Sequence, residues 1–498
     1  MFYKKFINFS KEGENKYLKP EAFAEIDKLK LFEKQKAKIL ILRGYFYLES
    51  GAYSRLQEVL QQTNSNFMKS WKYSLLKSEL CRTQLDYDGW RSNLLQAKKN
   101  ASLISSNKDS LAMIYNSLAV ASLAKGNKED HKRYLLEAIK YIDKNNPSKH
   151  AVFPNYIDNL LLTNEDLKFD DALDSYKKLI DFEDAEDVIA WYNYLIQISR
   201  QKNEAYKICQ LIDEMDHLIS NKFSLSESER AIFAVSGLRM RYNGNCDWKS
   251  HFAVIAANIQ YYLSLPQETA RIVSKELLGI MTHQQKEGQS FKKIDEVINV
   301  LIKFLKEYFK VVDKKTDTLK LEFVNERCNA IMEKADIIAR IVDKENIEKQ
   351  ISTNKNKIRL YKDVVEIYND EVDKANELHV RLLIIDEICS LDYSTVFAPE
   401  LIRLKYMESY EEFSKELESQ LEKSWSLLSG NRFEYFQYHP ELNDKILILS
   451  YYIYRELLDL ERSKVLLEKF ENSGVAIHHY ALWLRNYYDE LKIIHSGI

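Results

Sequence analysis

Apolar residues recur three and four positions apart along most of the chain, a spacing that gathers them on one face of an α-helix. Between Leu321 and Val342 this spacing continues for about three heptads, as in the seam of a coiled coil. A polar stretch at 343–357 interrupts it, and a second periodic segment follows from about 358 to 389. No strand-like alternation of useful length occurs. The pattern predicts an all-α chain with a long central helical hairpin, whose exposed turn lies near 343–357.

The N-terminal half divides into units that share one spacing of small residues. A very small residue precedes a turn glycine by seven positions in three pairs: Gly44 and Gly51, Ala119 and Gly126, Gly237 and Gly244. Small or apolar residues recur nine and twelve positions after each turn glycine. Two helices approach closely only where a side chain is small, and glycine can end a helix in the left-handed conformation. Each unit is therefore expected to be a pair of antiparallel helices.

This arrangement resembles the tetratricopeptide (TPR) repeat, which has a small residue at its eighth position and glycine at its fifteenth. Units begin near residues 37, 71, 112 and 153, and a sixth begins near 230. The resemblance covers roughly residues 30–265, about half of the chain. It implies a TPR-like helical-repeat solenoid, a fold that presents extended surfaces to protein or peptide partners.

Four parts are expected along the chain. Residues 1–30 form an N-terminal extension or capping helix, and residues 31–265 form the TPR-like arm. Residues 266–395 contain long helices with the coiled-coil-like hairpin, and residues 396–498 form C-terminal helical repeats or a cap.

Glycine and proline are scarce, with 12 and 6 residues in a chain of 498. Hairpins and phosphate-binding loops need residues with positive φ, so the chain can form few of them. The apolar content of 45% is enough for a continuous core. The formal net charge of −3 argues against broad nucleic-acid binding, which depends on clustered positive charge.

The cysteines are scattered and form no C-x-x-C pair: Cys81, Cys209, Cys246, Cys328 and Cys389. Neither a disulfide framework nor a zinc site is indicated, so we expect buried free thiols in a reducing cytosol. The N-terminal segment has no apolar core of signal-peptide length, and no apolar run is long enough to cross a membrane. We therefore expect a cytoplasmic protein that has no membrane partner.

Catalytic and cofactor-binding motifs are missing from the sequence, which contains no G-x-x-x-x-G-K-[ST], G-x-G-x-x-G, H-E-x-x-H or G-x-S-x-G. The histidines are dispersed, and the adjacent His478 and His479 would point about 100° apart on a helix. We expect no catalytic residue, no metal and no cofactor, and we interpret the chain as a scaffold, adaptor or sensor subunit.

The TPR resemblance also implies which residues line the inner face of the solenoid, because fixed positions of each first helix line it. The candidate partner-binding residues on this face are Lys38, Tyr45, Lys72, Glu79, Arg82, Asn116, Arg241 and Tyr242. TPR domains that clamp chaperone carboxylates carry Lys and Asn at two positions where this chain has Ile41 and Tyr45. A co-chaperone function is therefore disfavoured.

A second candidate surface is a basic stripe that could contact phosphates or acidic groups: Lys303, Lys306, Lys310 and Lys314. Glu307 and Asp313 interrupt it, so a solvated helix face is the favoured interpretation. Two alternatives to the scaffold stay open, a peptide- or ligand-sensing regulator and a helical subunit of a nucleic-acid-handling or microbial defence complex. An enzyme ranks after both.

Overall fold

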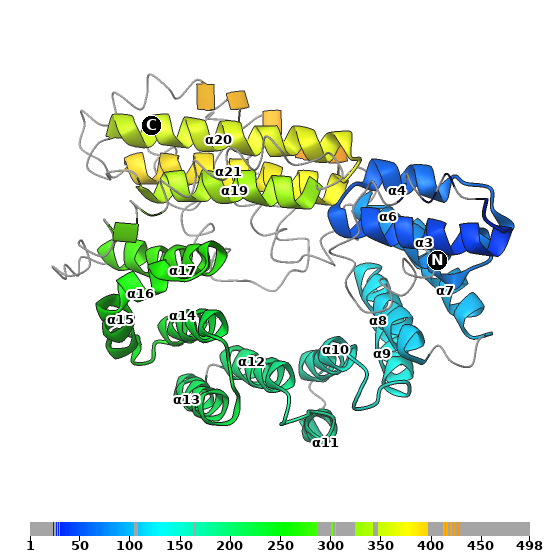
Figure 1. Cartoon of the computed structure of the whole chain (residues 1–498), viewed down its shortest axis with the longest axis horizontal. Coiled ribbons are helices and arrows are strands. Elements are labelled where there is room, and N and C mark those ends of the chain that lie inside the picture. Colours follow the sequence, from blue (N-terminus) through cyan, green and yellow to red (C-terminus); the bar gives the residue numbers. More distant parts are fainter. Residues whose placement is uncertain are drawn as a thin grey trace, which may run out of the picture.

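The computed structural model describes residues 30–103, 108–163, 166–202, 204–286, 324–341 and 347–396 (Figure 1). It also describes scattered positions between 23 and 28, at 300–304 and from 412 to 427. Every regular element in these residues is an α-helix, as the spacing of apolar residues predicts. None of the described helices is long and apolar enough to span a membrane.

Most of the arm consists of helices that pack against their chain neighbours in pairs, such as α6 with α7 and α8 with α9. Its helices are α3 (Glu33–Ser50), α4 (Tyr53–Leu60), α5 (Ser65–Met68), α6 (Trp71–Thr83), α7 (Tyr87–Ala101), α8 (Lys108–Ala124), α9 (Lys128–Ile139), α10 (Lys149–Leu162), α11 (Asp166–Lys177), α12 (Ala185–Gln201), α13 (Ala205–Lys222), α14 (Glu227–Asn243), α15 (Trp248–Ala257), α16 (Ile259–Ser264) and α17 (Gln267–Lys286). Together they follow a curved path, and α17 extends the arm beyond the boundary expected at residue 265 (Figure 1).

Several helices begin at a short polar side chain that caps free backbone N–H groups. Asp86 accepts a hydrogen bond from the Gly89 N–H, and Asn127 accepts one from the Asp130 N–H. At the start of α14, Ser226 and Glu229 each accept a hydrogen bond from the other's backbone N–H. These caps satisfy donors that have no partner inside the helix, so they fix where each helix starts.

Left-handed residues connect the two helices of a pair. Gly51 (φ 78°) and Gly126 (φ 70°) confirm two of the predicted turns. The third prediction is wrong by one position, because Gly244 has φ −89° and the left-handed residue is Asn245 (φ 54°). Asparagine tolerates this conformation better than most residues, since its short polar side chain bonds locally. Leu85 (φ 60°) takes the same role between α6 and α7.

The small residues permit close helix contacts in two of the three predicted places. A Cβ atom at Gly44 would lie 2.5 Å from Cδ1 of the buried Leu76, so α3 and α6 approach closely there. Ala119 is fully buried, and its carbonyl oxygen lies 2.9 Å from Nδ1 of His131 on the paired helix. Gly237 differs, because its neighbours are the polar ends of Arg241 and Asp216 rather than an apolar side chain. The arm is a TPR-like solenoid.

Beyond the arm, three long helices form a bundle: α19 (Val324–Ile341), α20 (Ile347–Asp370) and α21 (Lys374–Val396). The exposed turn predicted near 343–357 is misplaced, because residues 347–357 belong to α20. That stretch is rich in polar residues, yet Ile351 and Ile358 are spaced seven apart and are both buried, so one face still packs. The single helix predicted over 358–389 is also wrong, because a turn that contains Val372 (φ 55°) separates α20 from α21.

The bundle connects both ends of the arm, which closes the curved path into a ring (Figure 1). At one end, the Asn325 amide donates to the Glu49 carbonyl (3.2 Å). The Ser54 hydroxyl and N–H donate to the Glu371 carboxylate (2.7 and 3.1 Å). At the other end, Arg271 of α17 pairs with Glu333 of α19. The first contact includes a shared apolar core, in which arm residues and bundle residues are buried together.

Two parts of the predicted organisation lie outside the described residues. These are most of the N-terminal extension at 1–30 and most of the C-terminal part at 396–498. The whole basic stripe at Lys303, Lys306, Lys310 and Lys314 also lies outside them. Within 412–427, the described positions are helical.

Candidate interaction groove

Three of the predicted inner-face residues, Tyr45, Glu79 and Arg82, lie beside the contact between arm and bundle. Arg82 pairs with Glu79 (2.9 Å) and interacts electrostatically with the buried Asp373 at the start of α21. Burial raises the pKa of Asp373 to about 6. Burial, with Glu79 and Glu49 nearby, also raises the pKa of Tyr45 well above its usual range. Charged and polar groups there are thus largely engaged within the chain.

The other predicted residues on this face are spread over several helices. Lys38 is exposed, and the Lys72 ammonium lies 5.5 Å from the centre of the Trp71 ring. Burial lowers the pKa of Lys72. Asn116 accepts a hydrogen bond from the Asn155 amide (2.9 Å), which links α8 to α10. These residues do not gather into one site in the described part of the chain.

A cavity of about 900 Å³ lies between α13, α14, α15 and α16. Its lining is mainly apolar and aromatic, and includes Ile219, Phe223, Leu225, Phe233, Val254, Ile255, Tyr261 and Tyr262. Polar members include Asp216, Glu227, Arg230, Arg241 and His251. We call this cavity the α13–α16 groove. Its size falls in the range of pockets that hold small ligands or side chains of a partner.

Two apolar side chains of the groove are open to solvent. Val254 is 63% exposed and Tyr261 is 47% exposed, although both belong to amphipathic helices whose other faces are buried. Burying such side chains against a partner is favourable by about 25 cal/mol per Å² of apolar surface. Apolar surface that is left open beside a hollow is typical of binding sites.

Arg241 lines the groove and connects α14 to α13. Its guanidinium donates to Asp213 (2.7 Å) and to Asp216 (2.5 Å), and the residue is only 4% exposed. Burial raises the pKa of Asp216, although Arg241 opposes this effect. Arg241 was predicted to bind a partner directly, but in this structure both sides of its guanidinium fork are engaged within the chain. Tyr242 packs edge-on against Trp248 (5.3 Å between ring centres).

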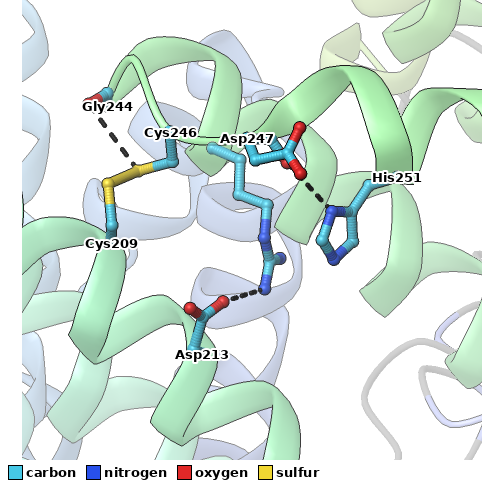
Figure 2. Close-up of a disulfide and its surroundings, with 7 residues drawn as sticks. Cys209, Asp213, Gly244, Cys246, Asp247 and His251 are labelled. Carbon is cyan, nitrogen blue, oxygen red and sulfur yellow. Dashed lines mark hydrogen bonds and ion pairs between the residues drawn. A yellow bond between two sulfur atoms is a disulfide. The ribbon is translucent and has the colours of Figure 1, made fainter.

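A disulfide joins Cys209 of α13 to Cys246 in the turn between α14 and α15 (Figure 2). The prediction of free thiols at these two positions is therefore wrong, while Cys81 and Cys328 are free as expected. The left-handed Asn245 reverses the chain direction immediately before Cys246, and the two cysteines are 37 positions apart. Nothing local in the sequence indicates this pairing. The disulfide also removes one argument for a reducing cytosol, so the cytoplasmic location stays a prediction.

A second polar cluster lies between α10, α11 and α12 and is mostly buried. Asp187 accepts hydrogen bonds from the Lys149 ammonium (2.6 Å) and from Nε2 of His150 (2.7 Å). Nδ1 of His150 lies 2.8 Å from the Tyr176 hydroxyl oxygen. Tyr176 is only 1% exposed, whereas the His150 side chain is 26% exposed. This Lys149–Asp187–His150–Tyr176 network joins the consecutive helices α10, α11 and α12.

No protein-family model matches this chain, and no curated protein sequence matches it. Two solved structures align with most of its length. The structure of Naa15/Naa10 bound to HypK-THB is 12% identical with a TM-score of 0.23, and the alignment covers 98% of this chain and 96% of that one. The yeast Tom70 structure is 10% identical with a TM-score of 0.20, and covers 86% and 96%. Similarity at this level carries no information about function.

Proposed function

We propose that this protein is a non-catalytic scaffold or adaptor that binds a segment of a partner protein in the α13–α16 groove. The observation that carries the proposal is the combination of a cavity of about 900 Å³ with the solvent-exposed Val254 and Tyr261 on its wall. Solenoids bind partners through such surfaces because consecutive repeats present a continuous face.

The lining of the groove supports a short helix or peptide with bulky apolar side chains as the ligand. Four aromatic rings offer flat apolar contacts, and interface energies are concentrated on a few such buried anchors. Arg230 on the groove wall is exposed and has no ion-pair partner among the residues that the structure describes. It could pair with a carboxylate of the ligand, so an apolar segment that carries an acidic residue fits best.

The test compares a groove variant with a matched surface variant. The groove variant combines Val254→Arg with Tyr261→Ala, and the control is Tyr206→Ala, which removes an 86% exposed tyrosine of α13 outside the groove. Both proteins should be helical and monodisperse. Proteins captured by the wild type from its native host are quantified by mass spectrometry.

We expect a captured protein that the Tyr206→Ala control retains and the groove variant loses. Its direct binding is then measured with purified components. Equal capture of every protein by the wild type, the groove variant and the control would disprove the use of this groove.

A further inference from the structure

The disulfide and the α13–α16 groove are built from the same helices. The groove has α13 on one side and α15 and α16 on the other, with α14 between them. Cys209 belongs to α13, while Cys246 belongs to the turn that leads from α14 into α15 (Figure 2). A covalent bond therefore fixes one side of the groove to the segment that positions the other side.

We infer that the oxidation state of Cys209 and Cys246 regulates the ligand affinity of the α13–α16 groove, with the disulfide form binding more tightly. This inference rests on the proposed function of that groove. The physical reason is preorganisation, because a binding site that is already held in shape loses less conformational entropy when its ligand binds.

Other contacts also hold the α14–α15 segment against α13, among them the packing of Met240 and Cys246 against the apolar cluster that contains Ile208 and Ile212. The ion pairs of Arg241 with Asp213 and Asp216 form one connection. The close approach of Gly244 to Ile208 forms another, where an added Cβ atom would lie 2.8 Å from Cγ2 of Ile208. All of these contacts are non-covalent, so breaking the disulfide leaves the turn attached to α13 but less tightly restrained.

The Cys209–Cys246 disulfide is accessible to a small reductant. After reduction, the Cys246 thiol has a hydrogen-bond acceptor nearby. Cys209 and Cys246 are both partly exposed, so a small dithiol can attack. The dithiol gives two electrons and two protons, the Cys209–Cys246 bond breaks into two thiols, and the reductant becomes a disulfide. The Cys246 sulfur already lies 3.6 Å from the Gly244 carbonyl oxygen, which can accept a hydrogen bond from the new thiol (Figure 2).

The two free cysteines of the described residues differ from this pair. Burial raises the pKa of the Cys81 thiol to about 11 and that of the Cys328 thiol to about 12. Thiols react as thiolates, so both are unreactive near neutral pH. Cys81 is therefore a suitable control position.

The experiment measures binding of anilinonaphthalene sulfonate, an anionic aromatic dye, to the full chain before and after reduction with dithiothreitol. Intact-mass measurement establishes the disulfide in the oxidised sample. The part of the dye signal that Val254→Glu removes is assigned to the groove, because the new carboxylate repels the sulfonate of the dye. We expect its Kd to weaken by at least about fivefold on reduction, the lower end of typical coupling between sites, and to recover on reoxidation.

Two variants complete the design. Cys246→Ser should bind like the reduced protein under all conditions, while Cys81→Ser should respond to dithiothreitol as the wild type does. If Cys246→Ser fails to fold, the reversible reduction of the wild type carries the test alone. A groove Kd that is unchanged or tighter after reduction overturns the inference, and so does an oxidised sample with no Cys209–Cys246 bond. Dye binding that Val254→Glu leaves intact instead counts against the groove and with it against the proposed function.

Discussion

Replacing Asp187 with alanine should be among the most damaging single changes in the arm. Asp187 accepts hydrogen bonds from Lys149 (2.6 Å), from His150 (2.7 Å) and from the backbone N–H of Asp181 (2.7 Å). Lys149 is only 5% exposed, so the substitution would leave its ammonium group buried without its carboxylate. Breaking a buried ion pair in this way costs about 3–5 kcal/mol of the free energy of unfolding.

The pH dependence of this loss has a definite sign. Burial raises the pKa of Asp187, but the hydrogen bonds from Lys149, Asp181 and His150 outweigh it and the net pKa lies below its ordinary value of 3.8. A carboxylate with a lowered pKa stabilises the folded state fully above its unfolded pKa and loses that contribution as the pH falls through the folded pKa. The difference between the wild type and Asp187→Ala should therefore be largest near neutral pH and shrink below about pH 4.

Urea unfolding followed by circular dichroism at pH 7 and pH 3.5 measures both effects. Asp184→Ala is the matched control, because Asp184 lies three residues away and caps α12 without touching Lys149. Loss of such a cap costs about 1 kcal/mol. If Asp187→Ala lowers the free energy of unfolding no more than Asp184→Ala does at pH 7, the Lys149–Asp187–His150–Tyr176 network does not stabilise the arm.

Three further predictions test the packing, the disulfide and the ring closure. Gly44→Ala should lower the free energy of unfolding by about 1–3 kcal/mol, because the new Cβ overlaps the buried Leu76 side chain, and an unchanged melting temperature would contradict the close contact. Reduction of the Cys209–Cys246 disulfide should lower the free energy of unfolding by about 3–4 kcal/mol, because the bond closes a loop between positions 37 apart. Identical urea unfolding curves for the oxidised and the reduced protein would refute this. Glu371→Gln removes a charged acceptor from Ser54 at the start of α4, so hydrogen exchange in α4 should become faster, and unchanged protection would show that the ring does not depend on this contact.

Local features of the fold can be predicted from the sequence where the backbone conformation requires one particular residue type. Gly51 and Gly126 mark turns because a left-handed backbone excludes most side chains. The slip at Gly244 shows the limit of this rule, since Asn245 also tolerates positive φ and takes the turn instead. Leu85 adopts the same conformation without any such signal, held by its surroundings.

In the central hairpin, the polar composition of 347–357 masks a helical periodicity. Charged and amide side chains dominate that stretch, but a helix needs only one apolar face to pack, and Ile351 and Ile358 supply it. The boundary between α20 and α21 was missed for the opposite reason. Val372 is apolar and continues the periodic pattern, although its backbone is left-handed.

The candidate groove could not be predicted, because its defining features join residues that are far apart or look like core. Val254 and Tyr261 lie in helices whose apolar pattern does not distinguish a buried residue from one beside an open cavity. Of its lining, only Arg241 was predicted as a partner contact, and its pairing with Asp213 and Asp216 depends on how α13 and α14 dock. Helical periodicity carries no information about such docking.

Closing the ring changes the mechanics of the solenoid. In an open array each repeat contacts only its neighbours, so small rotations between repeats add up and the array can extend along its length. Here the bundle holds the first unit through Glu371 and the last arm helix through Glu333, so the two ends cannot separate freely. A force applied at the α13–α16 groove is therefore transmitted along the ring in both directions, to the contact at Glu371 and to the contact at Glu333. A ligand that altered the curvature of the arm would therefore strain the contacts at Glu371 and Glu333.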